Sequence, residues 1–204
     1  MRSVSAMQPE QEATDFAILQ AMIGRLDDYL TRERLYWPMA VETPTGTRWP
    51  TMSIGVVLAY LVRLRALADR LTPEQCAFLS HAEAELQRAR RWYPEAYQSH
   101  VIQELQSLLH SWTWFLNECI EEPEKCRDTY PAEARVRTHL QLLIEHIGEH
   151  MVPDEILRQV YLLDQRLRMR FQPSDFIWAP ELASAFPRER FWWLYGQLTV
   201  PPAS

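Results

Sequence analysis

The sequence has little lysine, glycine or cysteine, and the first two shortages exclude particular functions and folds. Only Lys125 among the 21 basic residues is a lysine, and it lies between prolines in a predicted loop, so a buried Schiff-base lysine is not expected. Five glycines in 204 residues leave little room for tight hairpins or glycine-rich phosphate loops. With 47% hydrophobic residues available for a core, we expect an all-α protein.

The three cysteines, Cys76, Cys119 and Cys126, contain no C-x-x-C pair. The sequence therefore indicates neither a zinc knuckle nor a disulfide framework. A reducing compartment is the simplest location for such an odd set, so the predicted location is the cytoplasm.

Long apolar runs are also missing. The longest uncharged stretch, residues 49–62, has 14 residues, whereas about 20 are needed to cross a bilayer. The first residues lack the apolar run of a signal peptide. A formal net charge of -6 repels phosphate and anionic lipid, so we expect neither nucleic acid nor a membrane as a partner.

Apolar residues recur at helical spacing along most of the chain. Ser53 is predicted to cap one helix, and Thr72 with Gln75 to form a capping box at the start of the next. The predicted helices cover approximately residues 9–37, 53–71, 73–92, 94–119, 131–151 and 153–167.

These helices predict an antiparallel four-helix bundle core, with the helix at 73–92 as an extra outer helix. The expected domains are a disordered lead-in (1–9), the bundle (10–170) and an aromatic, proline-rich tail that packs on it (171–204). No strand pattern is visible, and residues 38–52 are predicted to be a loop.

One stretch, LLIEHIGEHM at residues 142–151, suggests a specific chemistry. His146 and His150 are four residues apart, and His139 precedes His146 by seven. On a helical wheel with Leu143 at zero, the three histidines fall at roughly -20° to -60°, on one flank of the buried seam. Two histidines one turn apart can share a metal, although pairs at the edge of a bundle are more often plain surface side chains.

The same stretch matches the protease pattern H-x-x-E-H, in which Glu149 would be the general base. The wheel turns Glu149 and Glu145 away from the histidines, and Gly148 weakens the helix. We therefore reject the protease interpretation.

A second stretch, RWPTMSIGVVLAYLVRLRAL at residues 48–67, resembles the second helix of the DinB-like metal-binding bundles. In that family a tryptophan and a serine precede an apolar helix with the first metal histidine, and a later helix supplies H-x3-H. Trp49 and Ser53 match the first element, while His146 and His150 match the second. The resemblance implies a three-histidine site in a metal-dependent hydrolase or thiol transferase.

Tyr60 stands where the family has its first histidine. A neutral phenol binds zinc or nickel poorly, and its deprotonation at pH 7 costs about 4 kcal/mol. Glu104 and His139 are candidate third ligands, although Glu104 could instead bond to a histidine or to Tyr60, or point to solvent. The sequence thus predicts a degenerate metal site and leaves enzymatic activity open. The histidines predicted to be peripheral are His81, His100 and His110.

The tail carries eight aromatic residues, including FWWLY at 191–195. It could fold back and seal the bundle, or form an interaction surface, for example of a homodimer. A bundle that binds an apolar or tetrapyrrole ligand is a third alternative. Within the tail, one short helix is predicted at about residues 187–195, ending before Gly196.

Overall fold

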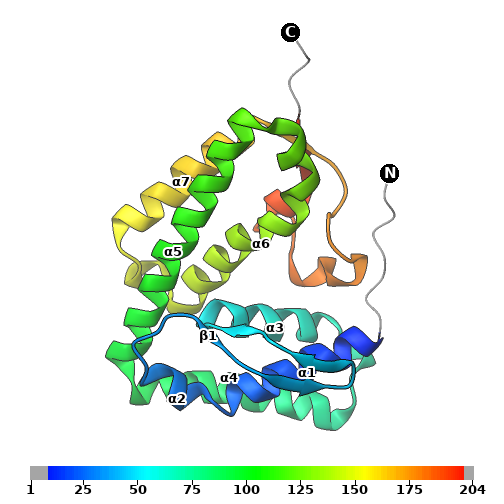
Figure 1. Ribbon diagram of the computed structural model, residues 1–204, viewed down its shortest axis with the longest axis vertical. Helices are drawn as coiled ribbons and strands as arrows, with labels where there is room; N and C mark the ends of the chain where they lie inside the picture. The colour runs from blue at the N-terminus through cyan, green and yellow to red at the C-terminus, as the bar shows by residue number, and fades with distance from the viewer. Residues whose placement is uncertain (1–8, 200–204) are drawn as a thin grey trace. The chain divides into compact units, whose positions relative to one another are not determined.

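Helices dominate the computed structural model, which describes residues 9–199 (Figure 1). The all-α prediction is confirmed, and the described strands form only small antiparallel pairs. Within the described residues the chain forms two compact units, residues 9–104 and residues 105–199. The predicted lead-in falls outside the described residues except for Pro9, and the four-helix arrangement stays a prediction.

Three of the six predicted helices and the start of a fourth lie in the first unit, and the helix predicted at 73–92 has the predicted ends. The long helix predicted from residue 9 to 37 breaks at Gly24 and is over by Leu30. The next predicted helix also ends early, at Ala66, because the chain tightens there into a 3-10 turn. The helical elements are α1 (Pro9–Ile23), α2 (Leu26–Leu30), α3 (Ile54–Ala66), η1 (Ala68–Arg70), α4 (Pro73–Trp92) and the start of α5 (Pro94–Glu121).

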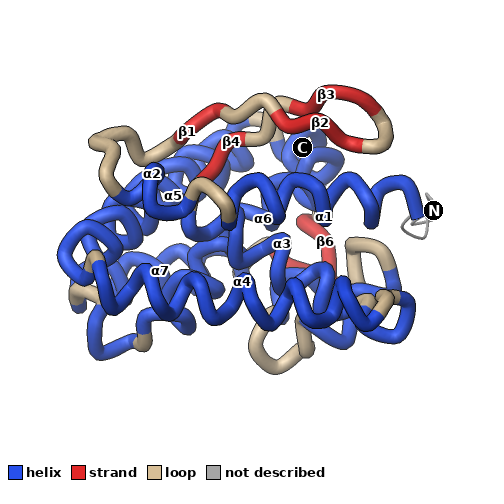
Figure 2. The backbone as a smooth tube through the Cα atoms, turned by 90° about the horizontal axis from the view of Figure 1, so that it is seen from below, coloured by secondary structure: helices blue, strands red, loops and turns tan. Residues whose placement is uncertain are grey.

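The prediction of a loop at residues 38–52 is wrong. Two antiparallel pairs, β1 with β4 and β2 with β3, form an arm that turns at Gly46, where φ is 101° (Figure 2). Its buried side chains, Met39, Val41 and Met52, provide the apolar contacts, and β2 packs against α1. The strands are β1 (Trp37–Pro38), β2 (Val41–Thr43), β3 (Gly46–Arg48) and β4 (Thr51–Met52).

In the second unit, the helix predicted to begin at Pro131 begins at Pro123. Proline is favourable at the first helical position, and Pro131 is accommodated inside the helix at the loss of one backbone hydrogen bond. The elements after α5 are α6 (Pro123–Ile147), η2 (Glu149–Met151), α7 (Asp154–Arg168), β5 (Phe171–Pro173), η3 (Pro180–Ala185), η4 (Trp192–Leu194) and β6 (Gly196–Leu198).

No disulfide framework was indicated by the sequence, but the structure contains one disulfide. Cys119 near the end of α5 and Cys126 in the first turns of α6 form a disulfide, while Cys76 is free and half-buried. The segment between the two cysteines was predicted to be part of a loop. In the structure it is a sharp turn between two helices. Among the described residues, no helix combines the length and the apolar character needed to cross a membrane.

Candidate functional site

The predicted histidine pair does not stand on one helix. α6 ends at Ile147, and Gly148 takes a φ of 87°, which only glycine adopts easily. His146 therefore lies in the last turn of α6, whereas His150 lies in the separate 3-10 turn η2. The helical wheel that placed both on one face, one turn apart, is wrong beyond residue 147.

Packing at the helix end explains why the chain breaks there. A Cβ atom added to Gly148 would lie 2.9 Å from His150 Cε1 and 3.0 Å from its Nδ1. The His150 ring thus lies against Gly148. His150 is nevertheless an exposed residue. His139 and His146 are half-buried on α6.

The predicted ligands are divided between the two units. Tyr60 and Glu104 belong to the first, and the three histidines to the second. Within residues 9–199, no three histidine, cysteine, aspartate or glutamate side chains are grouped closely enough to bind a metal ion. Metal binding by His146 and His150, with Tyr60, Glu104 or His139, stays a prediction.

Glu104 is instead a buried hydrogen-bond acceptor at the start of α3. Its side chain, 1% exposed, accepts from the Ser53 hydroxyl at 2.6 Å and from the Gly55 N–H at 3.0 Å. Ser53 also caps α3, since its oxygen accepts from the Val56 N–H at 3.3 Å. Glu104 thereby ties α5 to the positive end of the α3 dipole.

Burial decides how this carboxyl group titrates. Loss of hydration raises the pKa of Glu104 to about 7, against the opposing effect of its hydrogen bonds from Ser53, Gly55 and Ile54. The side chain can therefore hold or release a proton near neutral pH. Both of its oxygens accept hydrogen bonds from the first residues of α3 and from the Ser53 cap.

Further polar residues of α2 and α5 surround Glu104. His100, predicted to be peripheral, is buried one helical turn before it, with Nδ1 2.9 Å from the Ala96 carbonyl oxygen. The His100 ring centroid is 4.8 Å from that of Tyr29, and His100 Nε2 has no hydrogen-bond partner among the described residues. Burial and the nearby Glu104 charge raise the pKa of Tyr29. The pKa of Tyr97 is also raised, mainly by burial. The spacing of Tyr97, His100 and Glu104 puts them on one face of α5, so the sequence could have predicted that these polar side chains lie together.

The aromatic tail folds back onto α6. The Trp193 indole donates to Thr138 Oγ1 at 3.0 Å, and its carbonyl accepts from the Tyr130 hydroxyl at 2.7 Å. β6 pairs with β5 and also lies against α6. Several of the large aromatic residues are therefore core residues and unavailable to a partner: Phe186, Phe191 and Trp193. The predicted helix at 187–195 reduces to the 3-10 turn η4.

Large apolar side chains are exposed on α7 instead. Its core face carries Ile156, Val160, Leu163 and Leu167. On the opposite side, Tyr161 is 61% exposed and Leu162 57%, and Met169, directly after the helix, is 79% exposed. Leu162 and Met169 are seven residues apart and project from the same side of the helix. We call these three residues the α7 stripe.

Sequence and structure comparisons supply no relative from which to transfer a function. No known protein family, curated protein or solved structure matches the chain. The resemblance to the DinB-like bundles is therefore carried by the residues of this chain alone.

Proposed function

We propose that this chain is a DinB-like helical bundle protein with a degenerate metal site, which acts as a non-catalytic module and dimerises through the α7 stripe. The degenerate site is supported by Tyr60 in the place of a histidine, by the hydrogen-bonded Glu104 carboxylate and by the break at Gly148. The α7 stripe is the observation that carries the interaction part of the proposal.

The exposed side of α7 carries apolar side chains next to charged ones. A strongly amphipathic helix on a bundle is expected to be polar on its outer face. Here that face has a tyrosine, a leucine and a methionine among charged side chains, as the centre and rim of a protein interface do. Burying Tyr161 and Leu162 against a partner would remove apolar surface from water at a gain of about 25 cal/mol per Å².

A second copy of the same helix fits the charges around the stripe. α7 begins with Asp154 and Glu155 and ends with Arg166 and Arg168. In an antiparallel pair related by a two-fold axis, the acidic start of each helix faces the basic end of the other. One helix face is a small contact, so we expect a weak dimer with a dissociation constant in the micromolar range.

Sedimentation analysis over a series of micromolar concentrations tests the proposal. The wild-type chain should shift from monomer to dimer, and Leu162→Glu should remain monomeric with an unchanged circular dichroism spectrum. Trp92→Ser, which removes a large exposed side chain on α4, is the matched control and should dimerise as the wild type does.

Charge exchange distinguishes pairing through α7 from nonspecific association. Glu155→Arg and Arg166→Glu should each weaken the dimer, and the double variant should restore it. A chain that stays monomeric throughout the series, or a dimer unaffected by Leu162→Glu, contradicts the proposal.

A further inference from the structure

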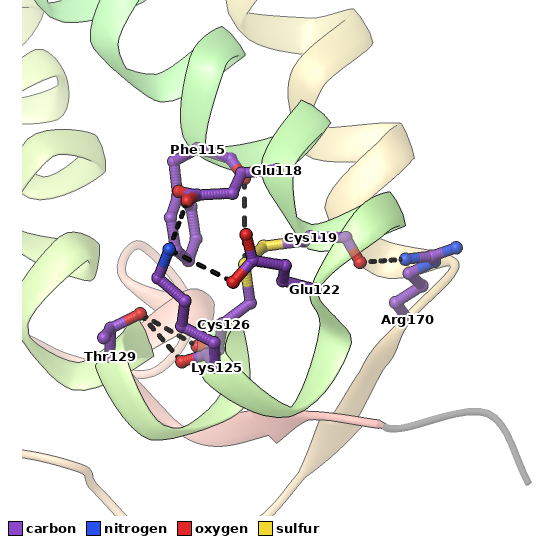
Figure 3. Close-up of a disulfide and its surroundings, with 8 residues drawn as sticks. All are labelled: Phe115, Glu118, Cys119, Glu122, Lys125, Cys126, Thr129 and Arg170. Atoms are coloured by element: carbon purple, nitrogen blue, oxygen red, sulfur yellow. Dashed lines mark hydrogen bonds and ion pairs between the residues drawn. A yellow bond between two sulfur atoms is a disulfide. The ribbon is translucent and has the colours of Figure 1, made fainter. Parts of the chain in front are cut away.

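The disulfide joins two consecutive helices across a sharp turn. Cys119 and Cys126 are seven residues apart in sequence, with Cα atoms 5.3 Å apart, inside the usual range for a disulfide (Figure 3). The two residues are 4% and 1% exposed. The covalent bond therefore fixes the approach of α5 to α6 from inside the unit.

Noncovalent contacts hold the same turn without the disulfide. Lys125 on α6 bonds to Glu118 on α5 at 2.6 Å and also lies 3.2 Å from Glu122. Arg170 lies in the segment after α7, and its guanidinium donates to the Cys119 carbonyl at a distance of 2.6 Å (Figure 3). Because these contacts use no sulfur atom, the turn keeps its supports when the disulfide is broken.

The surroundings of the two sulfur atoms can also accommodate free thiols. Cys126 Sγ lies 3.9 Å from the Phe115 carbonyl oxygen, within reach of a weak hydrogen bond from an S–H group. Free cysteine is readily buried as a small apolar side chain, so Cys119 needs no polar partner. Both oxidation states are thus compatible with one backbone arrangement.

From these contacts we infer that Cys119 and Cys126 form a reversible dithiol–disulfide pair, a redox modification site that tightens the α5–α6 turn. A small-molecule disulfide such as oxidised glutathione is the oxidant. One cysteine thiolate attacks it and releases one thiol, and the second cysteine displaces the other thiol from the mixed disulfide. Two cysteine thiols lose two electrons and two protons, and the reagent disulfide becomes two thiols.

The surroundings set how fast this exchange runs. Both sulfur atoms are buried, so exchange requires opening of the turn, and the carboxylates of Glu118 and Glu122 lie beside it. A pair of this kind is compatible with the predicted cytoplasmic location, where thiols are mostly kept reduced.

The test uses the full chain with Cys76→Ser, which removes the third thiol. The protein is equilibrated in buffers of reduced and oxidised glutathione, and free thiols are counted by alkylation and mass spectrometry. The dithiol and disulfide forms should interconvert, share one circular dichroism spectrum, and differ in Tm by roughly 5 to 15 °C, the oxidised form being higher.

A double variant separates this pair from a purely structural disulfide. Cys119→Ser with Cys126→Ser should fold and melt like the reduced form, independently of the buffer. The inference is overturned if no disulfide forms under excess oxidised glutathione. It is equally overturned if reduction unfolds the unit, or if native protein resists dithiothreitol.

Discussion

Each unit buries an ionisable side chain, and the two are stabilised differently. Glu104 in the first accepts hydrogen bonds from neutral donors, the Ser53 hydroxyl and the Gly55 N–H. Arg137 in the second forms a two-pronged ion pair with Asp164, at 2.8 and 2.9 Å, and its Cζ atom lies 3.9 Å from the Trp193 ring centroid. Burial therefore makes Glu104 depend on a proton and Arg137 on an oppositely charged partner.

Breaking the ion pair should give the largest effect. Arg137→Met leaves the Asp164 carboxylate without its partner and removes the cation above Trp193, so the second unit should lose about 3–5 kcal/mol of stability. Urea unfolding followed by circular dichroism, with hydrogen exchange of α6 peptides, measures the loss.

Arg135→Met on the same helix is the matched control, because Arg135 is exposed, and it should change stability by less than about 0.5 kcal/mol. Replacing both members of the pair, with Arg137→Met and Asp164→Leu, should recover much of the loss. A single variant as stable as the control would show that the ion pair does not anchor the unit.

The proton of Glu104 should give the next largest effect. Its pKa is about 7 in the folded chain against an ordinary 4.5, so the folded state binds the proton more tightly. The resulting stability is fully present below pH 4.5 and is lost as pH rises through 7. The loss amounts to about 3 kcal/mol.

Glu104→Gln should flatten this part of the pH profile and make the first unit more stable than wild type at pH values above the Glu104 pKa. Hydrogen exchange of α3 peptides across the pH range, corrected for the intrinsic exchange rate, measures it. Glu95→Gln, an exposed change on the same helix, should keep the wild-type slope. If the stability of Glu104→Gln and of wild type changed in parallel with pH, Glu104 would not be the group that causes the pH dependence.

The two helix caps are set by neighbouring residues and were predictable from sequence, whereas pairings between distant residues were not. The Ser53 cap and the Thr72–Gln75 capping box lie within one turn of their partners, and both predictions are confirmed. The bond from Ser53 to Glu104 spans 51 residues, and that from Trp193 to Thr138 spans 55. No periodicity encodes such pairings.

Two errors in the predicted fold have local causes. The strands of the β arm are two or three residues long, too short for an alternating pattern to stand out between prolines. Gly148 was recognised as a weak helical residue, but the apolar spacing from Ile147 to Met151 continued the wheel past it. The positive φ at Gly148 and the His150 ring against it decided the outcome.

Removing one side-chain hydroxyl from each unit should give a smaller effect that still separates the two units. Ser53→Ala deletes a helix cap and a donor to Glu104, and Tyr130→Phe deletes the donor to the Trp193 carbonyl; each should cost about 1–2 kcal/mol. Ser53→Ala should cost more at pH 8 than at pH 5, because the Ser53 hydrogen bond lowers the Glu104 pKa. Tyr130→Phe should cost the same at both pH values. Urea unfolding at the two pH values checks this, and a pH-independent cost for Ser53→Ala would contradict it.

Metal loading should give the smallest effect, because the phenol of Tyr60 stands where the resemblance implies the first metal histidine. Elemental analysis of chain dialysed against zinc or nickel, and then against buffer, should find well below one equivalent. His146→Ala should leave that value and the melting temperature unchanged, as should His110→Ala, an exposed histidine on α5. One equivalent of metal that disappears in His146→Ala but persists in His110→Ala would restore the metal centre and favour a hydrolase or thiol transferase over the interaction module.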